Sequence, residues 1–144
     1  MVIYTIGYTK KSLRDFIGRL RKNNIDKVID IRLNNTSQLA GYSKKDDLAF
    51  ILELFNISYE HRPILAPTED LLKAYTKKQI DWPEYERVFR QLLEDRKAVL
   101  PVLNNNSDEH ICFLCTEDKP EHCHRRLVAE HYLEKSGGSV IKHI

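Results

Sequence analysis

The amino-acid sequence predicts an α/β fold: a single domain over residues 1–144, with a mostly parallel sheet of about five strands and helices on both faces. Short runs of β-branched and aromatic residues alternate with segments whose apolar residues recur at helical spacing. The order of these segments is β-α-β-α-β-α-α-β-α-β. A length of 144 residues fits one domain, and 42% hydrophobic with 31% charged residues is typical of a globular chain.

Five short runs predict strands because they are rich in β-branched and aromatic residues. Gly7 ends the first run, and Pro63 follows the third. The predicted strands are residues 2–6, 27–31, 57–61, 111–115 and 139–143. Their alternation with helices favours parallel pairing, because parallel neighbours need a long crossover connection.

The longer segments predict amphipathic helices, because their apolar residues recur at spacings of three and four. The first begins at Ser12, which with Asp15 resembles a capping box, and it ends at Asn23. Pro83 is tolerated in the first turn of the most regular helix. The other predicted helices are residues 45–56, a shorter helix that starts within residues 67–70, and residues 121–135, which Gly137 and Gly138 end.

Composition excludes several classes of protein. The net charge of +2 gives no signal for a nucleic-acid or anionic-membrane partner. No apolar run approaches the roughly 20 residues of a membrane span, and the N-terminal residues lack the pattern of a signal peptide. Three cysteines suit a reducing cytosol better than a disulfide framework. We therefore expect a cytoplasmic protein without a membrane partner.

Polar side chains follow the predicted strands at ends that a parallel sheet brings to one edge. In such sheets ligands bind outside the carboxyl ends of the strands. The candidate site residues are Thr5, Gly7 and Tyr8 after the first strand, Asp30, Arg32 and Ser37 after the second, and Cys115, Glu117, Cys123, His124 and Arg125 after the fourth.

The charged candidates have a structural and a functional interpretation. Asp30 within an apolar strand is costly unless it is paired, so an ion pair with Arg32 or Arg125 is the structural one. In the functional one, the two arginines grip a carboxylate or phosphate of the substrate. Glu117, His124 or Asp30 then transfers protons.

The cysteines are the candidate nucleophiles. Cys123, His124 and Arg125 fall in the first turn of a predicted helix, where the helix dipole and basic neighbours lower a thiol pKa. We expect Cys115 or Cys123 to supply a thiolate. The alternative is that the thiols only pack in the core, which is favoured for Cys112.

The spacing Cys112-x2-Cys115-x7-Cys123-His124 contains the ligand types of a zinc site. Residues 112 and 115 point to opposite faces of a strand, which argues against a four-ligand site. We therefore expect no cofactor. A partial metal site on Cys115, Cys123 and His124 and a Cys115–Cys123 disulfide remain open alternatives.

The same residues resemble a known family. Leu114-Cys115-Thr116-Glu117 followed by Cys123-His124-Arg125 forms a Cys-x-Glu-x5-Cys-His-Arg element, and Asp30-Ile31-Arg32 ends the second strand. With Thr5-Ile6-Gly7 before the first helix, these motifs resemble the DUF488 family over essentially the whole chain. Tyr8 stands where many members have histidine. The resemblance implies the fold and the site, but the family has no established function and so implies no reaction.

We expect from the sequence an enzyme, a hydrolase or transferase, that binds an anionic small molecule or a nucleic-acid fragment at this edge. A phosphate or nucleotide-like substrate fits the arginine and cysteine chemistry. The first alternative is a non-catalytic module that binds nucleic acid or a partner, with salt-dependent affinity and no turnover. The second is a structural protein stabilised by a metal on cysteine and histidine.

Overall fold

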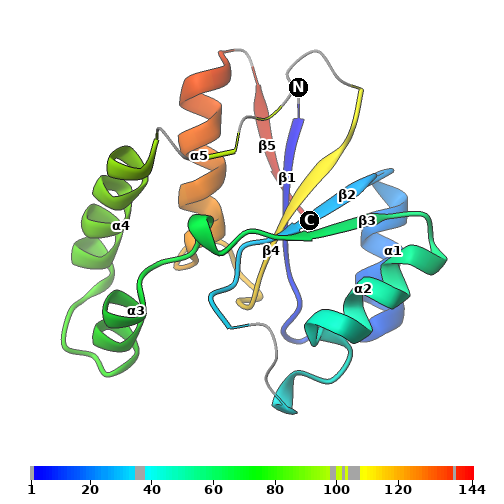
Figure 1. Cartoon of the computed structure of the whole chain (residues 1–144), viewed down its shortest axis with the longest axis horizontal. Coiled ribbons are helices and arrows are strands. Elements are labelled where there is room, and N and C mark those ends of the chain that lie inside the picture. The colour runs from blue at the N-terminus through cyan, green and yellow to red at the C-terminus, as the bar shows by residue number, and fades with distance from the viewer. Residues whose placement is uncertain (1, 35–37, 98–99, 102, 104–107, 138) are drawn as a thin grey trace.

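The computed structural model describes residues 2–34, 38–97, 100–101, 103, 108–137 and 139–144. Its centre is one sheet with the strand order β3-β2-β4-β1-β5, and every neighbouring pair is parallel. The strands are β1 (Val2–Gly7), β2 (Lys27–Asp30), β3 (Ser58–His61), β4 (Ile111–Cys115) and β5 (Val140–His143). The predicted α/β fold with a five-stranded sheet is confirmed (Figure 1).

Three of the described helices begin where the sequence places a capping side chain. Ser12 accepts a hydrogen bond from the Asp15 backbone N–H, Thr68 accepts one from Leu71, and Asp81 caps a third helix. The helices are α1 (Leu13–Lys22), α2 (Lys45–Leu54), α3 (Glu69–Thr76), α4 (Trp82–Arg96) and α5 (His124–Ser136), with short 3-10 turns at Gln38–Ser43 and Pro63–Leu65. In this described part of the chain, no helix is long and apolar enough to cross a membrane.

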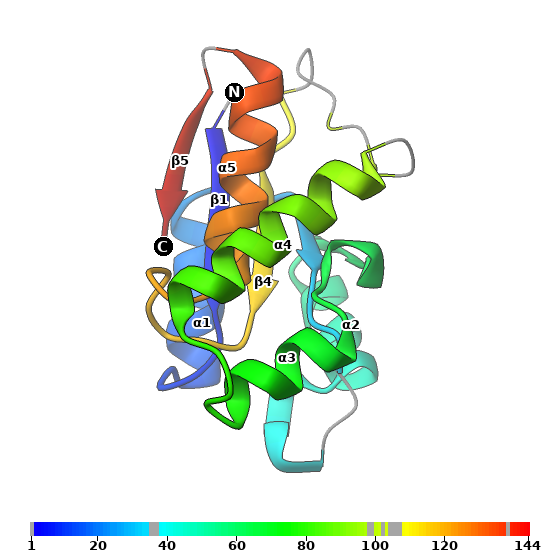
Figure 2. The same cartoon turned by 90° about the vertical axis from the view of Figure 1, so that its left-hand side faces the viewer.

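The sheet separates two hydrophobic cores. Phe16, Leu20 and Leu52 of α1 and α2 pack on one face. Phe89 of α4 and Leu127 of α5 pack on the other, together with α3 (Figure 2). The predicted helices on both faces are confirmed.

The α5 helix differs from its predicted bounds. It begins at His124 rather than at residue 121, because Cys123 has the extended backbone of an N-cap residue (φ −134°, ψ 139°). A turn precedes it, in which the Cys123 N–H donates to the Pro120 carbonyl. The predicted loop at residues 104–108 falls mostly outside the described residues.

The carboxyl end of β4 is the switch point of the fold. The chain leaves β1 and β2 toward α1 and α2 on one face, whereas it leaves β4, which lies between them, toward α5 on the other. Loops that diverge in this way leave a crevice between them, and ligands bind there in α/β folds. Cys115, the last residue of β4, stands at this position, in register with Gly7.

Candidate functional site

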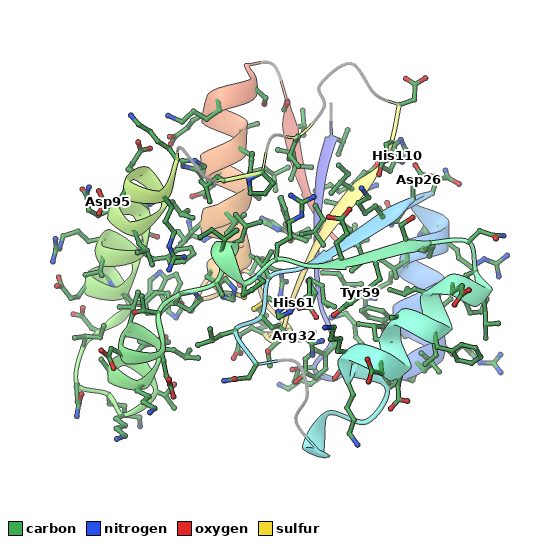
Figure 3. The ribbon with its side chains drawn as sticks, in the orientation of Figure 1. Asp26, Arg32, Tyr59, His61, Asp95 and His110 are labelled. Atoms are coloured by element: carbon green, nitrogen blue, oxygen red, sulfur yellow. The ribbon has the colours of Figure 1, made fainter. Side chains whose placement is uncertain are left out.

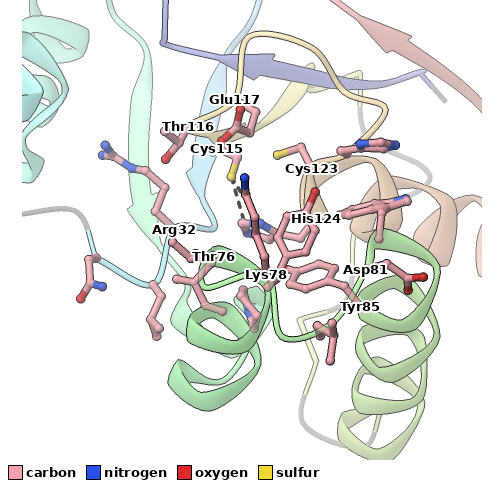
Figure 4. A pocket seen from close by; sticks show the side chains of 18 of the residues that line it. Arg32, Thr76, Lys78, Asp81, Tyr85, Cys115, Thr116, Glu117, Cys123 and His124 are labelled. Carbon is pink, nitrogen blue, oxygen red and sulfur yellow. Dashed lines mark hydrogen bonds between the residues drawn. The ribbon is translucent and has the colours of Figure 1, made fainter.

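A pocket of about 860 Å³ opens at this edge of the sheet (Figure 4). It lies between the loop after β2, the loop after β4, and the α3–α4 pair. The lining residues are Arg32, Leu33 and Asn34; Pro67, Leu72, Tyr75 and Thr76; Lys78, Gln79, Ile80, Asp81, Trp82 and Tyr85; and Cys115, Thr116, Glu117, His122, Cys123 and His124. Its volume lies within the usual range for small-molecule sites.

Cys115 and His124 form a buried pair in this pocket. The His124 Nδ1 atom lies 3.3 Å from the Cys115 Sγ atom, and its Nε2 atom lies 2.7 Å from the Ile31 carbonyl oxygen. A carbonyl oxygen only accepts hydrogen bonds, so Nε2 carries the ring proton and donates a hydrogen bond to the Ile31 carbonyl. The Nδ1 atom is thereby directed at the sulfur, either accepting from the thiol or donating to the thiolate.

Cys123 completes a cluster of three potential metal ligands. The ligand atoms of Cys115, Cys123 and His124 all lie within 4.8 Å of one another, and all three residues are buried. The three residues are therefore close enough together to bind one metal ion. Cys112 is excluded from this cluster because its side chain packs in the opposite core, on the α1 and α2 face.

The two clustered thiols differ in acidity. Burial opposes ionisation of Cys115, but the Cys123 thiol, the Thr116 backbone N–H and the Arg125 charge outweigh burial and lower its pKa. The neighbouring Cys115 and burial together raise the pKa of Cys123 well above the usual range. The sequence favoured Cys123 by its helix position, whereas the environment favours Cys115 as the thiolate.

Asp30 and Arg32 form the ion pair of the structural interpretation. Arg32 donates from Nε and Nη2 to the Asp30 carboxylate at 2.9 and 2.8 Å, and both side chains are buried. The Tyr59 hydroxyl donates to the same carboxylate at 2.5 Å, and His61 bonds the Arg32 carbonyl (Figure 3). Burial opposes ionisation of Asp30, but Arg32 and Tyr59 hold its pKa below the usual range.

Arg125 is fully buried and faces the loop after β4. Its guanidinium donates to the carbonyl oxygens of Glu117 and Asp118, and its Nε atom donates to the Thr5 hydroxyl at 3.2 Å. Gly7 leaves the space that this arrangement needs, since a Cβ atom there would lie 1.6 Å from the Glu117 carbonyl oxygen. Thr5, Gly7 and Arg125 therefore shape the loop and do not line the pocket.

Three of the predicted site residues remain to be placed relative to the pocket: Glu117, Tyr8 and Ser37. Glu117 is exposed and lines the pocket. The Tyr8 ring lies under the Arg32 guanidinium, with 5.3 Å between the guanidinium carbon and the ring centroid. Ser37 lies outside the described residues.

An aromatic wall lines part of this pocket, and the sequence alone points only to its Trp82, as an aromatic residue beside basic clusters that suits a nucleotide ligand. The Trp82 ring stacks on both Tyr85 and His122, with 5.0 Å between centroids and interplanar angles of 21° and 22°. Tyr75 packs against Trp82 and Tyr85 at 5.6 and 5.0 Å. Trp82 and Tyr85 are three residues apart and so share one face of α4. That spacing predicts core packing equally well, so it does not identify the rest of the wall.

Comparison with known families identifies one match. The model of the family described as "Domain of unknown function DUF488" matches residues 12–132. The chain belongs to this family. The DUF488 match begins after β1 and ends within α5, so it contains the Cys-x-Glu-x5-Cys-His-Arg element and the Asp30–Arg32 pair. Comparisons with curated proteins and with solved structures gave no match.

Proposed function

We propose that this DUF488 protein is an enzyme that uses Cys115 as a nucleophile on a small anionic, nucleotide-like substrate. The observation that carries the proposal is the Cys115–His124 pair, with 3.3 Å between Sγ and Nδ1, inside a pocket of about 860 Å³. A nucleophile beside a base that a third group orients is the recurring arrangement of cysteine catalysis. Here the Ile31 carbonyl is the orienting group.

The proposed reaction has two steps. The Cys115 thiol proton moves to Nδ1 of His124, and the sulfur forms a bond to the electrophilic atom of the substrate. The leaving group departs with the bonding electron pair and takes the proton from His124. In a hydrolase, water then gives a proton to His124 and attacks the same atom, and the sulfur leaves as a thiolate. Glu117, exposed in the pocket, is placed to assist proton transfer.

The anionic group of the substrate needs a partner other than Arg125, whose guanidinium binds backbone carbonyls and Thr5. Lys78 lines the pocket with an exposed side chain, and Arg32 lines it from the β2 side. We assign anion binding to these two residues. Lys78 is the more accessible, since Arg32 is 3% exposed and pairs with Asp30.

The test combines reactivity with turnover. At pH 7, iodoacetamide should alkylate Cys115 at least about 10-fold faster than Cys123, as followed by peptide mass spectrometry. Incubation with nucleoside monophosphates and phosphate esters should yield turnover and a covalent adduct on the Cys115 peptide. Cys115→Ser should lower turnover by at least about 1000-fold. Cys112→Ala, a change in the opposite core, should retain it. Equal alkylation of Cys115 and Cys123, or full turnover by Cys115→Ser, would overturn the proposal.

A second candidate is a metal-dependent enzyme centred on the same three residues. Three protein ligands with one open position are typical of catalytic zinc sites, where zinc supplies Lewis-acid chemistry. The bond from His124 Nε2 to the Ile31 carbonyl fits, because metal-binding histidines usually donate their second N–H to such a group. One equivalent of zinc by elemental analysis, with Cys115 alkylated only after chelation, would favour this candidate. Metal-free protein with a reactive Cys115 favours the nucleophile.

A further inference from the structure

The aromatic wall has a role that the proposed chemistry does not use. Three of its rings, Trp82, Tyr85 and His122, stack in nearly parallel planes beside the cysteine cluster. Tyr85 is 2% exposed and belongs to the core, whereas His122 is exposed and Trp82 is half-buried. Trp82 is the middle ring of this row, because both Tyr85 and His122 stack on it, so the ring face left open to the pocket is that of His122. A flat aromatic surface of this kind binds flat rings by stacking.

Polar groups adjoin the wall on neighbouring segments. Gln79 and Asp81 precede Trp82 in the α3–α4 loop, and Asn34 and Glu117 line the pocket from the loops after β2 and β4. Amides donate and accept hydrogen bonds, and carboxylates accept them. This set matches the edge of a heterocycle that carries amino and carbonyl groups. A purely aliphatic phosphate ester would use neither the wall nor these groups.

We propose that the pocket recognises its substrate through a nucleobase, which stacks on His122, the open end of the wall that Trp82 supports, while the attached phosphate reaches Lys78. This inference rests on the proposed function, because it takes the pocket beside Cys115 as the substrate site. The inference goes further by stating which part of the substrate contributes most to the binding affinity. The base is the main determinant, and the phosphate is the lesser one.

The binding test uses the single tryptophan of the chain as its reporter. Trp82 fluorescence should be quenched saturably by at least one of AMP, GMP, CMP and UMP. Ribose 5-phosphate, which keeps the phosphate and lacks the base, should bind at least about 10-fold more weakly. The corresponding nucleoside, which lacks the phosphate, should lose less affinity than that. Equal binding of ribose 5-phosphate, or no quenching by any of the four nucleotides, would overturn the inference.

Variants test the wall by a second readout, protection of Cys115 from iodoacetamide by the bound nucleotide. Trp82→Leu should weaken protection about 5- to 150-fold, the range expected for losing one stacking contact, because His122 loses the ring that holds it in place. Trp82→Phe should restore part of it, because a ring is retained. His122→Ala should give a similar loss, because it removes the exposed ring of the wall. The matched control is Phe50→Leu, an exposed aromatic residue on α2, which should leave protection unchanged.

The two proposals fail in different ways. If Cys115 reacts like an ordinary thiol while nucleotides still quench Trp82, the enzyme proposal fails and nucleobase binding stands. Suppose instead that Cys115 is alkylated rapidly and forms a covalent adduct, but the nucleotide protects Cys115 in Trp82→Leu as well as in the wild type. The nucleobase inference then fails. Circular dichroism of Trp82→Leu and Trp82→Phe, which should match the wild type, separates a binding defect from unfolding.

Discussion

The His124 imidazole is fixed from both sides, by the Ile31 carbonyl at 2.7 Å from Nε2 and by the Cys115 sulfur at 3.3 Å from Nδ1. Ile31 follows β2 and Cys115 ends β4, and the Ile31 N–H donates to the Leu114 carbonyl. The neighbouring strands therefore set the distance between the base and the sulfur. The orientation of the imidazole therefore depends on a backbone carbonyl, which no side-chain substitution removes directly.

Replacing the base should slow the nucleophile. We expect His124→Gln to lower the alkylation rate of Cys115 at pH 7 by at least about 10-fold, because the group that accepts the thiol proton is lost. Peptide mass spectrometry after timed iodoacetamide treatment measures the rate. His110→Gln, at the opposite edge of the sheet, is the control and should react like the wild type (Figure 3). An unchanged rate in His124→Gln would show that the imidazole does not activate the sulfur.

The Asp30–Arg32 pair should be important for stability. Asp30→Asn leaves a buried guanidinium without its carboxylate, so we expect a loss of about 3–5 kcal/mol in the free energy of unfolding. Urea denaturation measures it. Asp15→Asn breaks an exposed pair with Arg19 and should cost about 1 kcal/mol or less. Similar losses in the two variants would contradict the assignment of Asp30 as a buried anchor.

Gly7 should be irreplaceable where Gly18 is not. The Cβ atom of Gly7→Ala would collide with the Glu117 carbonyl oxygen, so the loop after β4 must shift. We expect a lower melting temperature and slower alkylation of Cys115. The matched change Gly18→Ala meets no atom within 4 Å in α1, and it should stabilise the helix by roughly 0.5–1 kcal/mol. The melting temperatures of both variants test this prediction. An unchanged melting temperature in Gly7→Ala would contradict the close approach of Gly7 to the Glu117 carbonyl oxygen.

Stability should fall as the pH decreases from about 7 toward 5. Burial lowers the pKa of His131 below its usual value, so the unfolded chain takes up a proton before the folded one does. The stabilisation is therefore complete above the unfolded pKa of about 6.5 and is lost as the pH falls from there toward the folded pKa. Urea midpoints at pH 7.5 and 5.5 measure the difference. His131→Phe should reduce it, and an equal difference in this variant would contradict the prediction.

The sequence predicted the elements of the fold well where the signals were local. Ser12 caps α1 and Gly7 ends β1 because capping and turn preferences act over a few residues. The helical pattern predicts the start of α5 too early, because residues 121–122 form a turn that leaves Cys123 as the N-cap. A helical pattern does not reveal which of several adjacent polar residues adopts the extended backbone of a cap.

The candidate site was predictable as an edge of the sheet but not as a set of contacts. Strand order brings Arg32, Cys115 and Glu117 to one pocket, and the α/β pattern alone implies that edge. The direction of Arg125 was not predictable, because its guanidinium is drawn to the carbonyls of its own loop. Trp82 reaches the pocket only through the placement of α3 and α4, which depends on tertiary packing.

Cys112 and Cys115 point to opposite faces of the sheet, so the same thiol reagent reports on a different part of the molecule at each of them. Cys112 is 0% exposed within the α1 and α2 core, so a reagent reaches it only when that core opens. Cys115 faces the pocket and reports the state of the site. In one sample, the labelling rate of Cys112 therefore reports the opening of the core, and the labelling rate of Cys115 reports whether the site is occupied. The sheet separates the two sulfurs, so the two rates are independent.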